Sequence, residues 1–263
     1  ENVSGTQSRK IGDGQFVLNL KKNSINAVIN DENWFVEPDN LVHKTTLDVT
    51  WETADLDVLR GVIYPGNFDN IKVKEYHDGE ITGKGVKIAI LDTGLDCDST
   101  ELNICGGAAF VDGVNSFSDD NGHGTAMAGI IGAAMDNVGL TGIAPDAELY
   151  SVKVLDSMGN GYVSAVTEGV NWAVENGMDI IFFGFAGKEY SYALSKAVEN
   201  ARDNNILMIA PAGNDGQEKI CYPAGYDGVV SVGSVDNTGN ISRFSNYGSY
   251  VDVYAFGEKA DSI

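Results

Sequence analysis

Residues 86–94 read VKIAILDTG, an apolar run that ends in Asp92 and a Thr-Gly pair. A short continuous apolar run bounded by turn residues predicts a buried strand over 86–91. A carboxylate at the end of such a strand is costly unless another group holds it, and an imidazole is one candidate. Taken alone, Asp92 is more often a helix cap or a turn residue. A catalytic role for Asp92 therefore needs partners elsewhere in the chain.

Strand-like and helix-like segments alternate from residue 83 onward. Apolar residues at helical spacing, such as Leu194, Ala197, Val198 and Ala201, predict helices whose apolar stripes pack on a sheet. Strands that alternate with helices imply an α/β fold with a mainly parallel central sheet. The expected strands are 86–91, 150–155, 179–185, 206–210, 229–235 and 250–255, and the expected helices are 125–134, 162–175 and 191–204.

Residues 1–80 have a different texture from the rest of the chain. Short apolar stretches at 16–20 and 34–36 are separated by charged turns, which predicts small strands or an extended arm. We therefore expect an N-terminal extension over 1–80 and a main domain over 81–263. The chain begins with neither Met nor a basic-then-apolar leader, which indicates a processed start.

The chain is strongly acidic. Lys and Arg number 17 against 38 Asp and Glu, a net charge of −21. This charge argues against nucleic acid and anionic membranes as partners and favours cations, calcium and basic peptides. The 43% hydrophobic content is that of a globular chain. The sequence has no run of about 18 apolar residues, so no transmembrane helix is expected.

Three cysteines, Cys97, Cys105 and Cys221, form an odd set without metal-ligand spacing. Neither a zinc site nor a disulfide framework is indicated. Cys97 and Cys105 could pair if the loop between them folds back, and buried free thiols are the alternative.

Chemically useful residues follow three of the expected elements. Asp92 ends a strand, His123 opens a helix within Gly122-His123-Gly124-Thr125, and Asn214 follows the strand that ends at 210. Reactive groups gather where parallel strands end and helices begin, because the loops converge there. We therefore expect Asp92, His123 and Asn214 to lie at one edge of the sheet.

Three sequence blocks, ILDTG at 90–94, NGHGTAMAG at 121–129 and APAGND at 210–215, occur in that order. They resemble the Asp, His and oxyanion-Asn blocks of subtilisin-like serine proteases, the subtilases. The resemblance extends over roughly 81–263 and implies a three-layer subtilisin-like α/β fold. It also implies that His123 is a general base, that Asp92 orients it and that Asn214 donates to an oxyanion.

The nucleophile of the resembled family lies in a Gly-Thr-Ser-Met-Ala block that this sequence does not contain. We expect a serine endopeptidase whose nucleophilic Ser is not in this chain, which by itself would be inactive. The alternative is a catalytically silent subtilase-like module that binds peptide or a protease. Retention of Asp92, His123 and Asn214 together favours the enzyme.

The resemblance also implies a cleft for an extended polypeptide substrate. Residues 184–187 correspond to the family's Ser-Leu-Gly edge strand, which recognises a peptide through main-chain groups. The loop that contains Gly159 and Gly161 would line the cleft further upstream. The expected substrate-binding residues are Gly159, Gly161, Gly184, Phe185, Ala186 and Gly213.

A calcium site is expected where the helix that His123 opens gives way to a loop. Many subtilases loop out around calcium there, and a hard cation needs six to eight oxygens. An ordinary helix-ending loop is the alternative. The expected ligands are the carboxylates of Glu101 and Asp136 and the carbonyls of Ala134, Val138 and Leu140.

Residues 26–39 are similar to the last strand of a subtilase propeptide, the small domain that assists folding and blocks the cleft. If so, residues before about 44 are a propeptide remnant and the chain's own propeptide is a partner. An extra strand arm is the alternative. An extracellular or cell-surface location is expected, with the cytoplasm left open.

Overall fold

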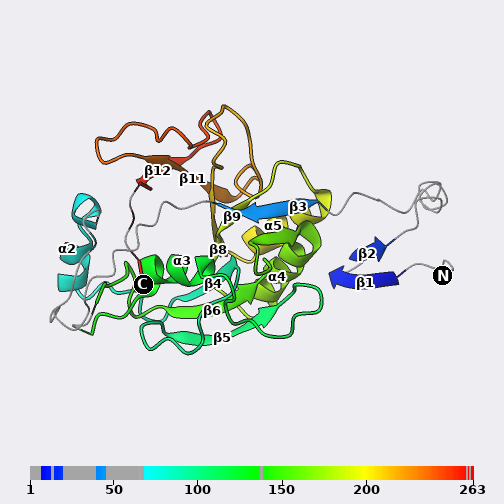
Figure 1. Ribbon diagram of the computed structural model, residues 1–263, viewed down its shortest axis with the longest axis horizontal. Helices are drawn as coiled ribbons and strands as arrows, with labels where there is room; N and C mark the ends of the chain where they lie inside the picture. The colour runs from blue at the N-terminus through cyan, green and yellow to red at the C-terminus, as the bar shows by residue number, and fades with distance from the viewer. Residues whose placement is uncertain are drawn as a thin grey trace.

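A seven-stranded sheet forms the centre of the fold (Figure 1). The computed structural model describes residues 7–12, 15–19, 40–45, 65, 68–136, 139–258, 260 and 262–263. All neighbouring strands of this sheet run parallel. Their order is β12 (Val253–Phe256), β11 (Val229–Val235), β10 (Leu207–Pro211), β8 (Ile180–Phe183), β4 (Lys87–Asp92), β6 (Glu148–Lys153) and β5 (Ile104–Ala109).

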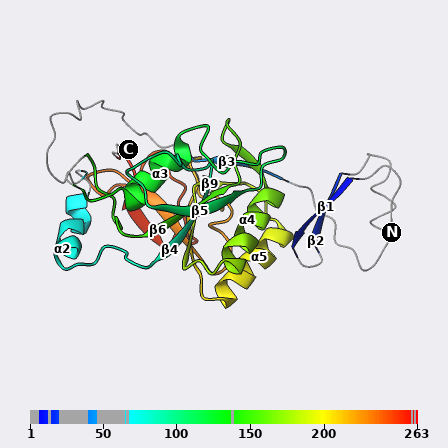
Figure 2. The ribbon, with the colours of Figure 1, turned by 90° about the horizontal axis from the view of Figure 1, so that it is seen from below.

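Helices cover both faces of the sheet. Ile88 and Ile90 of β4 pack with Ala128 of α3 (His123–Gly132), whereas Ala89 and Leu91 belong to the larger core formed with α4 (Val163–Glu175) and α5 (Tyr192–Asp203). Figure 2 shows α3 on one side of the sheet and the α4 and α5 pair on the other. Side chains alternate between the two faces of a strand, so β4 is buried on both sides. The expected three-layer α/β fold is confirmed.

The remaining elements are short. A hairpin joins β1 to β2, and a 3-10 helix precedes α2. A second sheet has three antiparallel strands in the order β7, β3, β9. The bounds are β1 (Gln7–Gly12), β2 (Gln15–Asn19), η2 (Phe68–Ile71), α2 (Val73–Asp78), β3 (Leu41–Lys44), β7 (Asn160–Tyr162) and β9 (Phe185–Ala186).

The strands and helices expected from periodicity are present, with ends shifted by a few residues. β5 was not expected, because Gly106 and Gly107 interrupt its apolar pattern. The stretch at 16–20 corresponds to β2, whereas the whole of 26–39, which includes 34–36, lies outside the described residues. Within the described part, no helix is long and apolar enough to span a membrane.

All three cysteines are free thiols. The pairing of Cys97 with Cys105 is therefore absent, and their expected burial is wrong, because both are exposed. Cys97 lies in the loop after β4, and Cys105 lies on β5 at the edge of the sheet. Only Cys221 is buried.

Helix α3 approaches the end of β4 closely at Gly124. A Cβ atom there would lie 2.1 Å from the Gly94 carbonyl oxygen and 3.2 Å from Asp92 Cβ. The backbone carbonyl cannot move aside without moving the turn after β4. The absence of a side chain at Gly124 therefore sets the distance between the strand end and the helix start.

We expect Gly124→Ala to lower the free energy of unfolding by about 2–3 kcal/mol, because the added methyl group must push α3 away from β4. Urea denaturation measures this. Gly79→Ala is the matched control, since Gly79 has φ −87° and the nearest atom to its Cβ position is 3.3 Å away. A loss at Gly124 no larger than that at Gly79 would contradict the close approach.

Candidate active site

Asp92 and His123 form a buried pair. Asp92 is the last residue of β4 and is fully buried, and His123 is the first residue of α3. The His123 Nδ1 atom lies 2.8 Å from Asp92 Oδ1 and 2.9 Å from Oδ2. The amide of Thr93 also donates to Oδ1 at 2.6 Å. A carboxylate in this position keeps the proton of the imidazole on Nδ1 and fixes the ring orientation.

The opposite nitrogen of His123 faces the main chain of the N-terminal segment. Its Nε2 atom lies 2.8 Å from the carbonyl oxygen of Thr45. A carbonyl oxygen only accepts, so this contact uses a proton on Nε2. A general base needs the same nitrogen free to take a proton. Occupancy by the Thr45 carbonyl and action as a base therefore exclude each other.

The segment that ends at Thr45 lies in the candidate cleft as an extended strand. β3 is the middle strand between β7 and β9, so its main chain is paired on both sides (Figure 1). At the last residue of β3, the Lys44 amide donates to the Gly159 carbonyl at 2.8 Å. The Thr45 amide donates to the Gly184 carbonyl at 3.2 Å. These are contacts that any extended peptide could make, whatever its side chains.

The structure places the expected substrate-binding residues around this segment. Gly161 pairs with Val42 on β7, Ala186 pairs with His43 on β9, and Phe185 pairs with Lys44. Gly159 and Gly184 accept the main-chain hydrogen bonds just described. Gly213 follows β10 and lines a hollow that Thr45 also lines.

Gly184 leaves room for the buried carboxylate. A Cβ atom there would lie 1.7 Å from Asp92 Oδ2 and 3.5 Å from His123 Cε1. The strand that accepts the Thr45 amide therefore runs directly beside the Asp92–His123 pair. This close approach gives a physical reason for glycine at a position where the resembled family has serine.

Asn214 lies close to the same region. It follows β10 and lines one hollow together with Thr45, Met127 and Gly213. The structure thus brings Asn214 toward the carbonyl-bearing end of the segment. An amide that can donate near a reacting carbonyl can stabilise a developing oxyanion.

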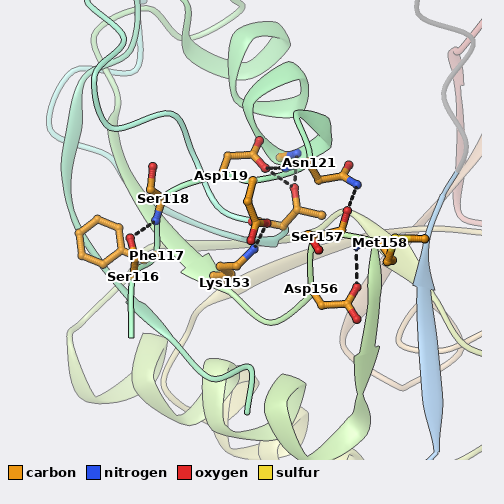
Figure 3. A network of polar contacts seen from close by, with 12 residues as sticks. Ser116, Phe117, Ser118, Asp119, Asn121, Lys153, Asp156, Ser157 and Met158 are labelled. Carbon is orange, nitrogen blue, oxygen red and sulfur yellow. Dashed lines mark hydrogen bonds and ion pairs between the residues drawn. The ribbon is translucent and has the colours of Figure 1, made fainter. Parts of the chain in front are cut away.

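A polar network holds the loops that carry Asp92 and His123 (Figure 3). The Asp119 carboxylate accepts from the Thr93 hydroxyl at 2.9 Å and from the Thr125 hydroxyl at 2.6 Å. It also accepts from the amides of Asn121, Gly122 and Thr125. The Thr93 oxygen in turn accepts from the Gly124 amide at 3.0 Å. Asp119 therefore ties the turn after β4 to the first turn of α3.

Lys153 adds a buried ammonium group to this network. It is fully buried at the end of β6, and its ammonium group donates to the Thr93 carbonyl and to Asp120 Oδ1, the latter at 2.7 Å. A buried ammonium is stable only when it is paired and hydrogen-bonded. Lys153 therefore fixes the Thr93 carbonyl while its charge is balanced by Asp120.

The hydrogen bonds to Asp119 lower its pKa. Burial alone would raise the pKa of this half-buried carboxyl, but the bonds from Thr125, Gly122 and Asn121 favour the ionised form and hold its pKa below the usual value. A group with a lowered pKa stabilises the fold above its unfolded pKa, and that contribution is lost as pH falls through the folded pKa.

The structure brings only some of the expected calcium ligands together. The Ala134 amide donates to the Glu101 carbonyl at 2.8 Å, which joins the loop after β4 to the loop after α3. Burial, and secondarily Asp136, raise the pKa of Glu101. Its Oε2 atom is buried without a hydrogen-bond partner. Leu140 follows the gap at 137–138, and Val138 lies outside the described residues.

The described residues contain no group of three or more His, Cys, Asp or Glu that could hold a metal ion. A cation beside Glu101 would therefore depend on main-chain oxygens as well as carboxylates. A hard cation accepts such oxygens, and the unpartnered Glu101 oxygen is the feature that fits it.

Sequence reasoning missed Asp119, Lys153 and the placement of β3. A lysine inside the apolar run 150–155 was a usable signal, because a charge on a buried strand needs a partner. Asp119 stands in a polar loop, where carboxylates are common and carry little information. β3 pairs through main-chain groups, which every residue has, so the sequence gives no signal for this pairing.

We expect Asp119→Asn to lower the free energy of unfolding at pH 7 by about 2 kcal/mol, because charge-assisted hydrogen bonds become neutral and one amide hydrogen faces a donor. The difference in unfolding free energy from the parent should narrow as pH falls below the ordinary Asp pKa of about 4, because the unfolded chain then binds a proton that folded Asp119, with its lowered pKa, takes up only at lower pH. Urea denaturation from pH 7 to 3 measures both effects.

Asp236→Asn is the control for this substitution. Asp236 is a turn carboxylate whose pKa is also lowered, chiefly by hydrogen bonds from Thr238 and Asn240. It lies far from the loops of the Asp92–His123 pair in sequence and should change stability less. An Asp119 effect that is the same at every pH would contradict the role given to its charge.

Comparisons with known proteins agree with this geometry. The family model described as "Subtilase family" matches residues 83–262. Subtilisin Savinase from Lederbergia lenta is 41% identical over 198 residues, which cover 75% of this chain and 73% of the relative. Subtilisin DY from Bacillus licheniformis is 43% identical over 179 residues, with 66% and 65% covered.

An alkaline protease from Alkalihalobacillus alcalophilus is 41% identical over 198 residues, which cover 75% of this chain. The match covers 52% of that relative, so the chain spans about half its length. The matched region contains the elements that bear Asp92, His123 and Asn214. The chain belongs to the subtilase family.

Proposed function

We propose that the protein is a subtilisin-type serine endopeptidase that cleaves extended polypeptides by Asp-His-Ser acyl transfer, with a nucleophilic serine outside these 263 residues. One observation carries the proposal. A peptide segment runs as the middle strand of the β7–β3–β9 sheet and presents its Thr45 carbonyl to Nε2 of the buried Asp92–His123 pair. A buried Asp–His pair beside a main-chain peptide supplies the general base that acyl transfer needs, and the contact with the Thr45 carbonyl blocks that base until the segment leaves.

The roles follow from the contacts. Asp92 keeps the His123 proton on Nδ1, so that Nε2 can take the proton of the serine hydroxyl and later give it to the leaving amine. Asn214 would stabilise the oxyanion of the tetrahedral intermediate. β7 and β9 would hold the substrate by main-chain hydrogen bonds and leave its side chains to set selectivity.

The segment that includes β3 is, in this proposal, a propeptide that blocks the cleft of a zymogen. Its support is the contact between the Thr45 carbonyl and His123 Nε2, which takes the position of the reacting group. Removal of the segment would free both the base and the sheet edges. The protein would then become active only after that step.

We expect a fluorophosphonate probe to label serine in the natural protein once the segment that includes β3 has been removed, and His123→Ala to lower the kcat/KM of that processed protein by about 10⁴-fold or more. Labelling followed by gel fluorescence and a peptide hydrolysis assay measure this. His77→Gln is the control, because His77 is a buried histidine that bonds the Ile143 carbonyl away from the cleft. An intact fold that is not labelled would favour a silent peptide-binding module.

Calcium is the proposed structural cofactor. Its support is the buried Glu101 Oε2 atom, which has no hydrogen-bond partner, and the nearby Asp136 charge that raises the Glu101 pKa. Two carboxylates close together repel, and a divalent cation between them would remove that repulsion. Glu101, Asp136 and the carbonyls of Ala134, Val138 and Leu140 would hold it.

We expect calcium at about ten times its Kd to stabilise the fold by about 1.4 kcal/mol, a rise in Tm of about 3–5 °C. Glu101→Gln should remove most of that rise, and Asp98→Asn, an exposed carboxylate in the same loop, should keep it. Calorimetry with calcium, with magnesium and with a chelator measures the effect. An equal rise with magnesium, or none with calcium, would contradict the site.

An extracellular or cell-surface location is part of the same proposal. A net charge of −21 disfavours nucleic acid and anionic membranes and suits a calcium-rich medium. The substrate class is polypeptide, and the first polypeptide in the cleft is the chain's own segment.

A further inference from the structure

The side chain of Lys44 is held at the cleft by a built set of contacts. Lys44 directly precedes Thr45, whose carbonyl faces His123. We infer that the cleft selects lysine immediately before the residue that supplies the reacting carbonyl, and that Asn121 is the residue that makes this selection. The inference rests on the proposed function, because it takes the β3 segment to lie as a substrate does.

Asn121 is oriented to receive an ammonium group. Lys44 Nζ donates to Asn121 Oδ1 at 2.8 Å. The Asn121 amide nitrogen donates to the Ser157 carbonyl at 2.8 Å (Figure 3), so the oxygen is left to face Lys44. The His123 amide also lies 3.3 Å from that oxygen. The side-chain oxygen is therefore placed before a lysine arrives.

The stem of Lys44 is recognised as well as its charge. At Gly159 a Cβ atom would lie 2.6 Å from Lys44 Cδ, 2.7 Å from Cγ and 3.0 Å from Cε. The methylene groups thus run along the bare backbone of Gly159, whose carbonyl accepts the Lys44 amide. Backbone, stem and ammonium are bound at three successive points, which fixes the length of the side chain that fits.

The charge of the surroundings has the sign that attracts lysine. The two loops that supply Asn121 and the Ser157 carbonyl also carry Asp119, Asp120 and Asp156. Asp120 is balanced by Lys153, while Asp119 and Asp156 accept hydrogen bonds from uncharged groups and keep their full negative charge. A single amide oxygen suits the compact ammonium of lysine better than the planar guanidinium of arginine.

Hydrogen exchange of this chain tests the contact without any catalytic step. We expect Lys44→Met and Asn121→Ala each to speed exchange of the Lys44 and Thr45 amides by roughly 10–100-fold, the worth of one hydrogen bond to a charged group. The double variant should exchange no faster than the faster single variant. Lys74→Met, at an exposed pair with Asp78, is the matched control and should change nothing.

Multiplicative effects in the double variant would overturn the inference, because Lys44 and Asn121 would then act independently. Unchanged exchange in both single variants would overturn it as well. Neither result depends on the nucleophile.

Peptide hydrolysis by the natural protein, after removal of the segment that includes β3, gives the second test. Matched peptides should differ only in lysine, norleucine or glutamate before the residue at the cleaved carbonyl. We expect kcat/KM for lysine to exceed that for norleucine by about 10-fold at low salt, to fall as salt screens the charge, and to lose its advantage in Asn121→Ala. Equal rates for lysine and norleucine would overturn the inference.

The two tests separate the two proposals. A natural protein that, after removal of the segment that includes β3, binds no fluorophosphonate and cleaves no peptide would refute the proposed function. The exchange experiment would still decide whether Asn121 selects lysine at this surface.

Discussion

A fully buried carboxylate at the end of β4 is the constraint on which the surrounding structure depends. Asp92 is tolerable there because His123 and the Thr93 amide both hydrogen-bond it. Reaching it requires the first turn of α3 to approach the strand end, which only a residue without a side chain permits at Gly124. The strand beyond β8 must pass equally close, and Gly184 allows that. The pair thus dictates the backbone around it.

The edges of the same backbone then form the cleft. Gly184 lies beside Asp92 and close to His123. A strand that is hydrogen-bonded to the Gly184 carbonyl is therefore brought to His123. β7 closes the other side of that path through main-chain bonds to β3. The strand at Gly184 therefore lies beside the Asp92–His123 pair and also binds the extended segment. This is why the segment reaches His123 Nε2 through main-chain contacts, without special side chains.

How far the sequence predicts this molecule depends on whether side chains or main chain decide each feature. Apolar periodicity predicted the strands of the large sheet apart from β5, and the helices that cover it, because burial of those side chains drives their formation. The blocks around Asp92 and His123 predicted the pair. The position of β3 was not predictable in this way, since its partners Gly161 and Ala186 lie more than 100 residues away and bind through backbone groups.

The network under the cleft shows a second limit and explains the placement of charge. Lys153 lies at the buried end of β6, and its hydrogen-bond partners Asp120 and Thr93 belong to two different loops. A cation buried there balances one carboxylate in a strongly acidic chain and leaves Asp119 to bind only neutral donors. The loops are thereby fixed while the surface above them stays negative. A lysine side chain arriving from the cleft then meets a neutral oxygen within a negative field, which favours its binding without the desolvation of a buried ion pair.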